Sequence, residues 1–215
     1  MKKNKLLIAL AIAACATTAL ADDEINYSLN LKSWNHKIKD SSTVSSNVSA
    51  TVISGTARKG QYFLTGSLLM PTTYYFGDGS YLDRRDADLA VGWSATSNIS
   101  LLGGAKRIQS NNYDFAGSSS SLTSSKFDIN YIGVNGFEAI GEKTFVYGTV
   151  TRSLSASKTK DGVKTTGLTF TTYEAGFGYV LSKEAQLTAG YRNQALKNDG
   201  TVTLSGFMVG ANFSF

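Results

Sequence analysis

The chain has 215 residues, of which 42% are hydrophobic and 17% charged, with a formal net charge of +5 at pH 7 and a mean hydropathy of −0.10. The charged fraction lies below the roughly 25% typical of soluble domains, which argues against a disordered polyelectrolyte. After residue 21, no apolar run approaches the roughly 20 residues of a membrane-spanning helix. One Cys, one His and one Pro exclude most disulfide frameworks, zinc sites and thiol enzymes, whereas 21 Gly, 11 Tyr and 11 Phe favour β-strands.

The first 21 residues predict a secretory signal peptide. Three lysines among the first five residues precede the apolar run Leu6–Ala14, and Ala19-Leu20-Ala21 forms a small-residue cleavage site. We therefore expect cleavage near Ala21 and a mature domain of residues 22–215. Loss of the three lysines lowers the net charge from +5 to about +2, so nucleic acid is not an expected partner.

Cys15 allows an alternative to cleavage near Ala21. Ile12-Ala13-Ala14-Cys15 loosely resembles a bacterial lipobox, in which Cys15 would become an acylated first residue. Under the favoured interpretation Cys15 is one small apolar residue of the signal and leaves with it.

Period-two alternation dominates the mature chain and predicts ten β-strands. In the segment Arg85–Ala95, for example, Ala87, Leu89, Val91 and Trp93 alternate with polar or small residues. The predicted strands are 25–36, 46–58, 61–70, 85–95, 98–109, 127–137, 144–154, 168–181, 186–195 and 201–215.

Short and long connections alternate along these strands. Tight turns lie near residues 60, 97, 141 and 184, and the longer, polar connections are 37–45, 71–84, 110–126, 155–167 and 196–200. Outer-membrane barrels place short turns at the periplasmic end and long loops outside, and closure removes the sheet edges that lipid cannot satisfy. We therefore predict an all-β, antiparallel, up-and-down transmembrane β-barrel with ten strands; eight strands is the alternative.

The second face of each strand indicates what lines the barrel. A soluble barrel buries its apolar face and a membrane barrel its polar face; the signal peptide, the loop asymmetry and the chain end favour the membrane barrel. Side chains fill the interior of barrels of this size, and buried charges need partners, so we expect a plugged or very narrow lumen. The expected lumen charge network is Asp86, Asp88, Lys106, Asp128, Arg152, Glu174 and Arg192.

The last strand ends on an aromatic residue. Its apolar face carries Phe207, Val209, Ala211, Phe213 and Phe215. This pattern resembles the C-terminal signature of bacterial outer-membrane β-barrels, and the whole mature chain is similar to small porin-like barrels of the OmpX, opacity-protein and OmpA-domain kind. The resemblance implies an outer-membrane location in a Gram-negative cell envelope and recognition of the last strand by the barrel-insertion machinery.

Candidate catalytic residues are few. His36 is the only histidine, and its neighbours Trp34-Asn35-His36-Lys37 reproduce no motif of the rim-sited lipid A deacylases or palmitoyltransferases, so we expect a solvated rim histidine. Asp83-Arg84-Arg85-Asp86 and Asp88 invite comparison with the paired acids of omptin-type proteases, but an inward salt-bridge cluster is favoured. We expect no enzymatic activity.

Metal and cofactor sites are not expected. Asp78 lies between two glycines and indicates a turn rather than a calcium ligand, and no Cys/His ligand set for a transition metal exists.

The longer connections indicate the class of function. Residues 117–125 read as a flexible, Ser-rich tip, and a basic outer loop carries Lys158, Lys160 and Lys164, which suits anionic lipopolysaccharide. We expect a structural or surface-interaction barrel in contact with outer-membrane lipid, lipopolysaccharide and a host or envelope surface ligand. A narrow pore for ions or small solutes is the alternative; a lipid A-modifying or proteolytic rim enzyme is less favoured.

Overall fold

The computed structural model describes residues 24–40, 43–116, 119–198 and 200–215, and these contain only strands, turns and bends. No helix among them is long and apolar enough to cross a membrane. The predicted signal peptide, residues 1–21, and Cys15 lie outside the described residues. The strands are β1 (Asn26–Lys39), β2 (Val48–Lys59), β3 (Tyr62–Tyr75), β4 (Tyr81–Ser94), β5 (Ile99–Ala116), β6 (Ser119–Ala139), β7 (Thr144–Lys160), β8 (Val163–Thr166), β9 (Thr169–Val180), β10 (Ala185–Lys197) and β11 (Thr201–Ser214).

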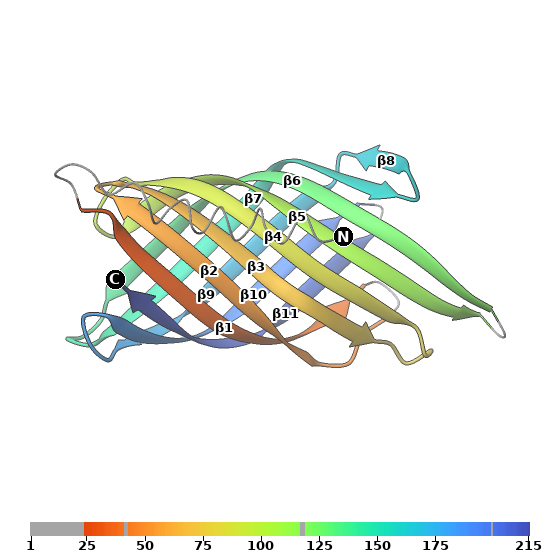
Figure 1. The fold of residues 1–215 in the computed structure, drawn as a ribbon, viewed down its shortest axis with the longest axis horizontal. Coiled ribbons are helices and arrows are strands. Elements are labelled where there is room, and N and C mark those ends of the chain that lie inside the picture. Colours follow the sequence, from red (N-terminus) through yellow and green to blue (C-terminus); the bar gives the residue numbers. More distant parts are fainter. Residues whose placement is uncertain (1–23, 41–42, 117–118, 199) are drawn as a thin grey trace.

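Ten of these strands close into one antiparallel barrel (Figure 1). Strands β1 to β7 pair in chain order, β7 pairs with β9, and β9, β10 and β11 continue the ring. β1 and β11 then pair from Ser28↔Ser214 to Lys39↔Thr203, which leaves no open edge in the barrel wall. β8 pairs only with the end of β7 and stands outside the ring. The predicted ten-stranded antiparallel barrel is confirmed, and the eight-stranded alternative is wrong.

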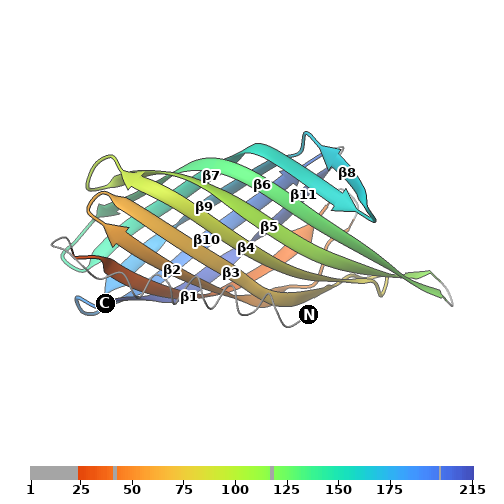
Figure 2. The same cartoon turned by 45° about the horizontal axis from the view of Figure 1, so that its top comes forward.

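The two ends of the barrel differ in the length of their connections (Figure 2). At one end the strands join through tight turns, of which the β2–β3 turn contains Gly60 at a φ of 56°. At the other end β5 and β6 continue as a paired ribbon up to Ala116↔Ser119. The predicted connection is therefore wrong for residues 119–125, which form a strand because the hydrogen-bonded ladder continues beyond the barrel wall. Residues 117 and 118 of the predicted flexible tip lie outside the described residues. Likewise, much of the predicted loop 155–167 is the end of β7 and β8.

We call the part of the barrel next to the tight turns the lower barrel; it carries an apolar belt on its outside. Along β11 the outward residues of the belt run from Phe207 to Phe215. The length of this segment matches the 9–11 residues of a tilted transmembrane strand. Exposed members of the belt on the other strands include Leu29, Leu31, Leu89, Val91, Leu101, Ile132, Val134, Val150, Phe177 and Leu187. The outside of the lower barrel therefore has the apolar surface and the strand length that the hydrocarbon of a bilayer requires.

Glycines and aromatic rings fill the inside of the lower barrel. A Cβ atom at Gly92 would lie 2.0 Å from the ring of Phe63, and one at Gly178 would lie 1.9 Å from the ring of Phe145. Only glycine, which has no side chain, leaves room for these rings at the two positions. The rings thereby fill space inside the barrel that water would otherwise occupy.

In the upper barrel, which is the part beyond the belt, the inner face is apolar and the outer face is polar. Its inward side chains form two apolar clusters, whereas its outward positions on β1 and β11 carry polar residues such as Ser33, Asn35 and Ser205. The expectation of a polar lining along the whole axis is therefore wrong for this half, because a wall surrounded by water needs an apolar core. The clusters are Trp34, Ile38, Ala50, Val52, Leu69, Tyr74, Leu204 and Met208, and Ile108, Ile129, Ala156, Leu168 and Phe170.

Candidate functional site

A layer of charged side chains crosses the lumen where the lower and upper barrel meet. On one side of the layer, Asp86 is buried and accepts two hydrogen bonds from Arg84, with Nε···Oδ1 and Nη2···Oδ2 distances of 2.8 and 2.7 Å. Lys106 Nζ lies 3.2 Å from Asp86 Oδ2 and 3.8 Å from Asp88 Oδ2, and the Tyr131 hydroxyl donates to Asp88. Both carboxylates thus have cationic partners, as buried charges require.

A second cluster forms around Glu174 on β9. Lys32 Nζ lies 2.7 Å from Glu174 Oε1, and Arg192 Nε lies 2.8 Å from Glu174 Oε2. Glu174 and Arg192 face each other on neighbouring strands, but Lys32 belongs to β1, and β10 and β11 lie between β1 and β9. The Lys32–Glu174 pair therefore spans part of the lumen.

Gln194 connects the wall on β10 to the first cluster. Its Oε1 accepts a hydrogen bond of 3.2 Å from Arg84 Nη2, which comes from β4. The Arg192 guanidinium also lies over the ring of Trp34, 5.5 Å from its centroid. Side chains from β1, β4, β9 and β10 thus contact one another inside the barrel at this level.

His36 lies directly above this layer, in the core of the upper barrel. It is 1% exposed, stacks on Trp34 at a centroid distance of 3.8 Å, and places Nδ1 2.9 Å from the Trp34 carbonyl oxygen and Nε2 2.6 Å from the Tyr74 hydroxyl. In the neutral ring Nδ1 donates to the carbonyl and Nε2 accepts from the hydroxyl. The expectation of a solvated rim histidine is wrong, because the ring packs inward with two aromatic neighbours.

The structure places five of the seven predicted lumen charges inside: Asp86, Asp88, Lys106, Glu174 and Arg192. It places the other two on the outer wall, so the prediction is wrong for Asp128 and Arg152. Both lie in the outward phase of their strands, Asp128 with Ile132 on β6 and Arg152 with Val150 on β7.

Sequence reasoning missed three members of the layer, Lys32, Gln194 and Tyr131. A usable signal existed for Lys32, which shares the inward period-two phase of Trp34 and His36. Of the acidic and basic run at the top of β4, Arg84, Asp86 and Asp88 point inward as an ion-pair cluster. Asp83 instead accepts a hydrogen bond from Thr73 and Arg85 donates to Gln109, both on the outside.

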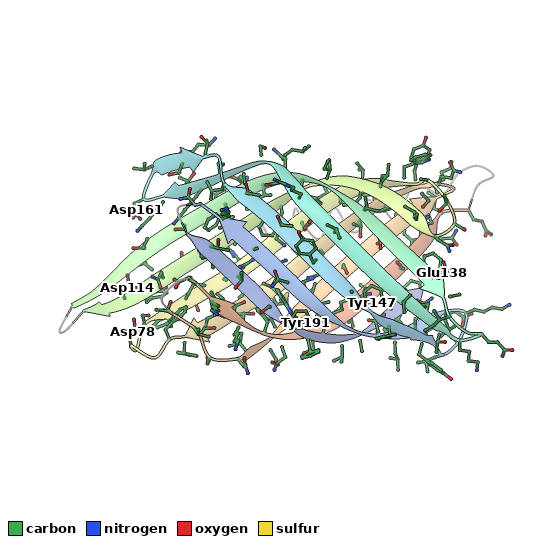
Figure 3. The ribbon with its side chains drawn as sticks, turned by 180° about the vertical axis from the view of Figure 1, so that it is seen from behind. Asp78, Asp114, Glu138, Tyr147, Asp161 and Tyr191 are labelled. Carbon is green, nitrogen blue, oxygen red and sulfur yellow. The ribbon has the colours of Figure 1, made fainter. Side chains whose placement is uncertain are left out.

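The remaining predicted residues lie at the two ends and on the belt. The five apolar residues of the last strand, Phe207, Val209, Ala211, Phe213 and Phe215, all lie on its outward face. Lys158 lies on β7 with Nζ 5.6 Å from the Phe127 ring centroid, whereas Lys160 and Lys164 are exposed on the β7–β8 hairpin. Figure 3 labels Asp78, Asp114 and Asp161 at the end with the long connections, and Glu138 at the opposite end.

Asp78 belongs to the β3–β4 turn. Its Oδ1 accepts hydrogen bonds from the Ser80 amide and hydroxyl, at 2.9 and 2.6 Å, and these hold the pKa of Asp78 below its ordinary value. Within the described ranges, no group of three or more His, Cys, Asp or Glu side chains could hold a metal ion.

No protein-family model matches the chain, and no curated protein matches it by sequence. Solved structures match it in fold. The outer membrane protease OmpT from Escherichia coli is similar at 13% identity and a TM-score of 0.62, covering 94% of this chain and 100% of that chain. The translocator domain of the autotransporter NalP from Neisseria meningitidis is similar at 10% identity and a TM-score of 0.54, covering 99% and 95%. The attachment invasion locus protein Ail of Yersinia pestis also matches, at 15% identity, a TM-score of 0.41, and 89% and 99% coverage.

The closed antiparallel ring, the apolar belt and the similarity to OmpT and to the NalP translocator domain define the class of fold. The protein has the fold of a bacterial outer-membrane β-barrel.

Proposed function

We propose that this protein is an integral outer-membrane β-barrel that is closed to free diffusion and acts through its extracellular surface. Three features support the proposal: the apolar belt, the side chains that cross the lumen, and the strands that extend beyond the belt at one end. The single observation that carries it is the charged layer, in which Lys32 reaches Glu174 and Arg84 reaches Gln194 across the interior.

The closed lumen has a direct electrical test. Above the charged layer lies an apolar core, and below it aromatic rings cover the glycines, which supports a lumen too narrow for a hydrated ion. We expect purified, refolded protein to show no stable channel in planar bilayers, with heat-modifiable gel migration as the control for folding. Stable nanosiemens openings would instead establish the alternative, a narrow pore for ions or small solutes.

The proposed interaction surface consists of the β5–β6 ribbon and the β7–β8 hairpin. Leu122 and Val163 are exposed there, at 59% and 70%, on elements that reach beyond the belt. Surface location can be tested with trypsin on intact cells, which should cut next to Lys160 or Lys164 and spare Lys59 and Lys183 at the tight turns. Cleavage confined to Lys59 and Lys183 would reverse the proposed orientation.

The function of the ribbon can be tested by shortening it. Gln109 and Lys126 are paired across β5 and β6, so residues 110–125 can be replaced by a two-residue Asn-Gly turn without changing the ladder below. Cells that carry the shortened protein should lose adhesion to host-cell or envelope ligands while their heat-modifiable migration remains. Unchanged adhesion by cells that show full surface display would contradict an interaction role for the ribbon.

Catalysis is not part of the proposal. A general base must reach its substrate, and the ring of His36 is covered by Trp34 and Tyr74. We expect His36→Ala to leave both the lipid A mass spectrum and the cleavage of peptide substrates unchanged. A change in either would establish a rim enzyme.

Delivery and insertion complete the proposal. Signal-peptide cleavage near Ala21 is tested by N-terminal sequencing of the protein from the outer-membrane fraction. The outward strip of β11 would be recognised by the insertion machinery, so deletion of Phe215 should slow insertion in cells more than Phe213→Leu, which keeps the apolar surface and the terminal aromatic. Equal insertion of both variants would remove this role from Phe215.

A further inference from the structure

The outer wall of the upper barrel has two sides that differ in charge. On β9, β10 and β11, the first outward positions above the belt carry small or polar uncharged residues, such as Thr171, Asn193 and Ser205. On β4 to β7 the corresponding wall is charged. We call its cationic residues, Arg85, Arg107, Lys126 and Arg152, the basic patch; they are accompanied by Asp83 and Asp128. The charged side therefore carries an excess of positive charge.

The basic patch is only partly neutralised by its own contacts. Asp128 serves two cations at once, with Arg107 Nε 2.7 Å from Oδ1 and Lys126 Nζ 3.3 Å from Oδ2. The side chains of Arg107 and Lys126 are 55% and 40% exposed, so solvent or an anion can reach them. Arg152 is exposed and has neither an ion pair nor a side-chain hydrogen bond among the residues that the structure describes.

The patch lies at the depth where lipid headgroups meet the wall. Arg152 pairs directly with Ile132 of the belt, and Arg107 pairs directly with Ala87, the uppermost small apolar residue on the outside of β4. Cationic side chains at this border can contact headgroup phosphates while their stems remain along apolar surface. On β9, β10 and β11 the same level carries hydroxyl and amide groups, and Lys37 of β1 pairs with Ser205 beside them.

A furrow of about 430 Å³ continues from this border down the outside of the belt. Its floor is the register row Gly136↔Gly148↔Ala175, on β6, β7 and β9, and Tyr173 and Tyr191 rise beside it. In Figure 3, β7, β9 and β10, coloured blue-green to blue, lie toward the viewer, and Tyr191 of β10 is labelled. Val150, which also lines the furrow, precedes Arg152 by two residues on the same outward face.

We propose that the wall from β4 to β10 holds one phosphorylated glycolipid of the leaflet at the long-connection end, with an acyl chain in the furrow and phosphates at the basic patch. Cations on three neighbouring strands favour a headgroup with more than one phosphate, because Arg107 and Lys126 lie on the β5–β6 pair and Arg152 lies on the next strand. The inference rests on the proposed membrane location, but it does not depend on whether the lumen conducts.

Titration with lipid A tests this proposal. The protein is folded in a phosphocholine detergent, and native mass spectrometry counts retained lipids over a range of concentrations. We expect one retained diphosphorylated lipid A per wild-type chain. The triple variant Arg107→Gln, Lys126→Gln, Arg152→Gln should bind at least about tenfold more weakly, since each cation near a charged lipid surface contributes to binding.

Matched variants separate charge from fold. Lys59→Gln, Lys143→Gln, Lys183→Gln removes three exposed cations at the tight-turn end and should leave lipid A binding unchanged. Equal binding by both triple variants would overturn the proposal. So would phosphatidylglycerol or monophosphorylated lipid A that binds as tightly as the diphosphorylated form, because the headgroup assignment rests on several phosphates.

The furrow has its own variant. A Cβ atom at Gly148 would come no closer than 3.6 Å to another residue's backbone, so Gly148→Val fills the furrow without a clash and suits a strand. It should weaken lipid A binding several-fold, whereas Gly55→Val, which is equally unhindered on the outside of β2, should not. Heat-modifiable migration of every variant shows that it is folded, and a furrow variant that binds like wild type would remove the acyl site.

Discussion

The lower and upper barrel use the same alternating strands with opposite faces. On β1, Leu29 and Leu31 point outward in the lower barrel, whereas Trp34 and Ile38 point inward in the upper barrel. β1 does this without a break or a shift in register. Its apolar residues occupy the outward alternate positions in the lower barrel and the inward alternate positions in the upper barrel. A single strand can therefore meet lipid at one level and support a water-surrounded core at the next. The charged layer lies where the two arrangements meet.

Replacing Asp86 tests that junction and should have the largest effect. Asp86→Ala leaves Arg84 and Lys106 buried without their carboxylate partner, which costs about 3–5 kcal/mol in the free energy of unfolding. Asp128→Ala removes the same residue type from an exposed ion pair and should cost less than about 1 kcal/mol. Urea unfolding in bicelles measures both, and similar losses would place the charged layer in a solvated environment.

Two isoleucines on β6 test whether the two halves bury apolar groups differently. Ile129 is 1% exposed inside the upper barrel, and Ile132 is 53% exposed on the belt. Ile129→Ala should cost about 2–5 kcal/mol because it leaves a cavity in packed protein. Lipid chains can fill the space at Ile132, so Ile132→Ala should cost only the transfer of its methylene groups, about 1–2 kcal/mol. The same unfolding assay applies, and a larger loss at Ile132 would contradict the assignment of the faces.

Two alanines on β10 locate the upper border of the belt. Ala189 and Ala195 both face outward, but Ala189 pairs with Phe177 and Val209, whereas Ala195 pairs with threonines on both neighbours. Ala189→Arg should destabilise the folded barrel by about 2–4 kcal/mol in a bilayer. Ala195→Arg should stay within about 0.5 kcal/mol of wild type. If folding into lipid vesicles tolerates both changes equally, the belt does not end between these residues.

Two glycines compare the inner and outer surfaces of the lower barrel. Gly178→Ala would force a methyl group into the Phe145 ring and should cost about 1–3 kcal/mol, whereas Gly148→Ala adds a methyl group to open outer surface. The second change should be neutral or slightly stabilising, because alanine loses less backbone entropy than glycine on folding. A thermal unfolding series in one detergent resolves the difference, and equal transition temperatures would mean that the Phe145 ring is free to move.

Period-two patterns and turn positions are enough to predict the ten strands, but not how far they extend. The Ser-rich stretch 119–125 lacks an alternating apolar face, so nothing in it indicates a strand; it forms one because it pairs with β5. Asp128 and Arg152 are predicted to point inward because they are charged, although each shares its phase with apolar belt residues. Above the border of the belt an outward charge does not have to enter hydrocarbon, so the period-two phase of the strand, and not the polarity of the residue, determines the direction of its side chain.

The charged layer in the lumen could be predicted only in part, because the sequence pattern of one strand does not show which side chains it meets across the barrel. Glu174 and Arg192 could be placed inside from their own strands, but their partner Lys32 is 142 residues away from Glu174 in sequence. Which inward side chains meet across a lumen depends on strand tilt and on the stagger between strands, and bulges such as the one between Leu69 and Thr72 alter that stagger locally.

The Lys32–Glu174 pair also constrains the order of assembly. It joins the first strand to the third-last strand, so its two charges stay hydrated until the final hairpin has arrived and the ring has shut. In a half-built sheet both groups stay in water, so the desolvation cost and the attraction between the charges arise together when the ring closes. The pair therefore stabilises the closed ring and contributes nothing to the stability of a partly assembled sheet.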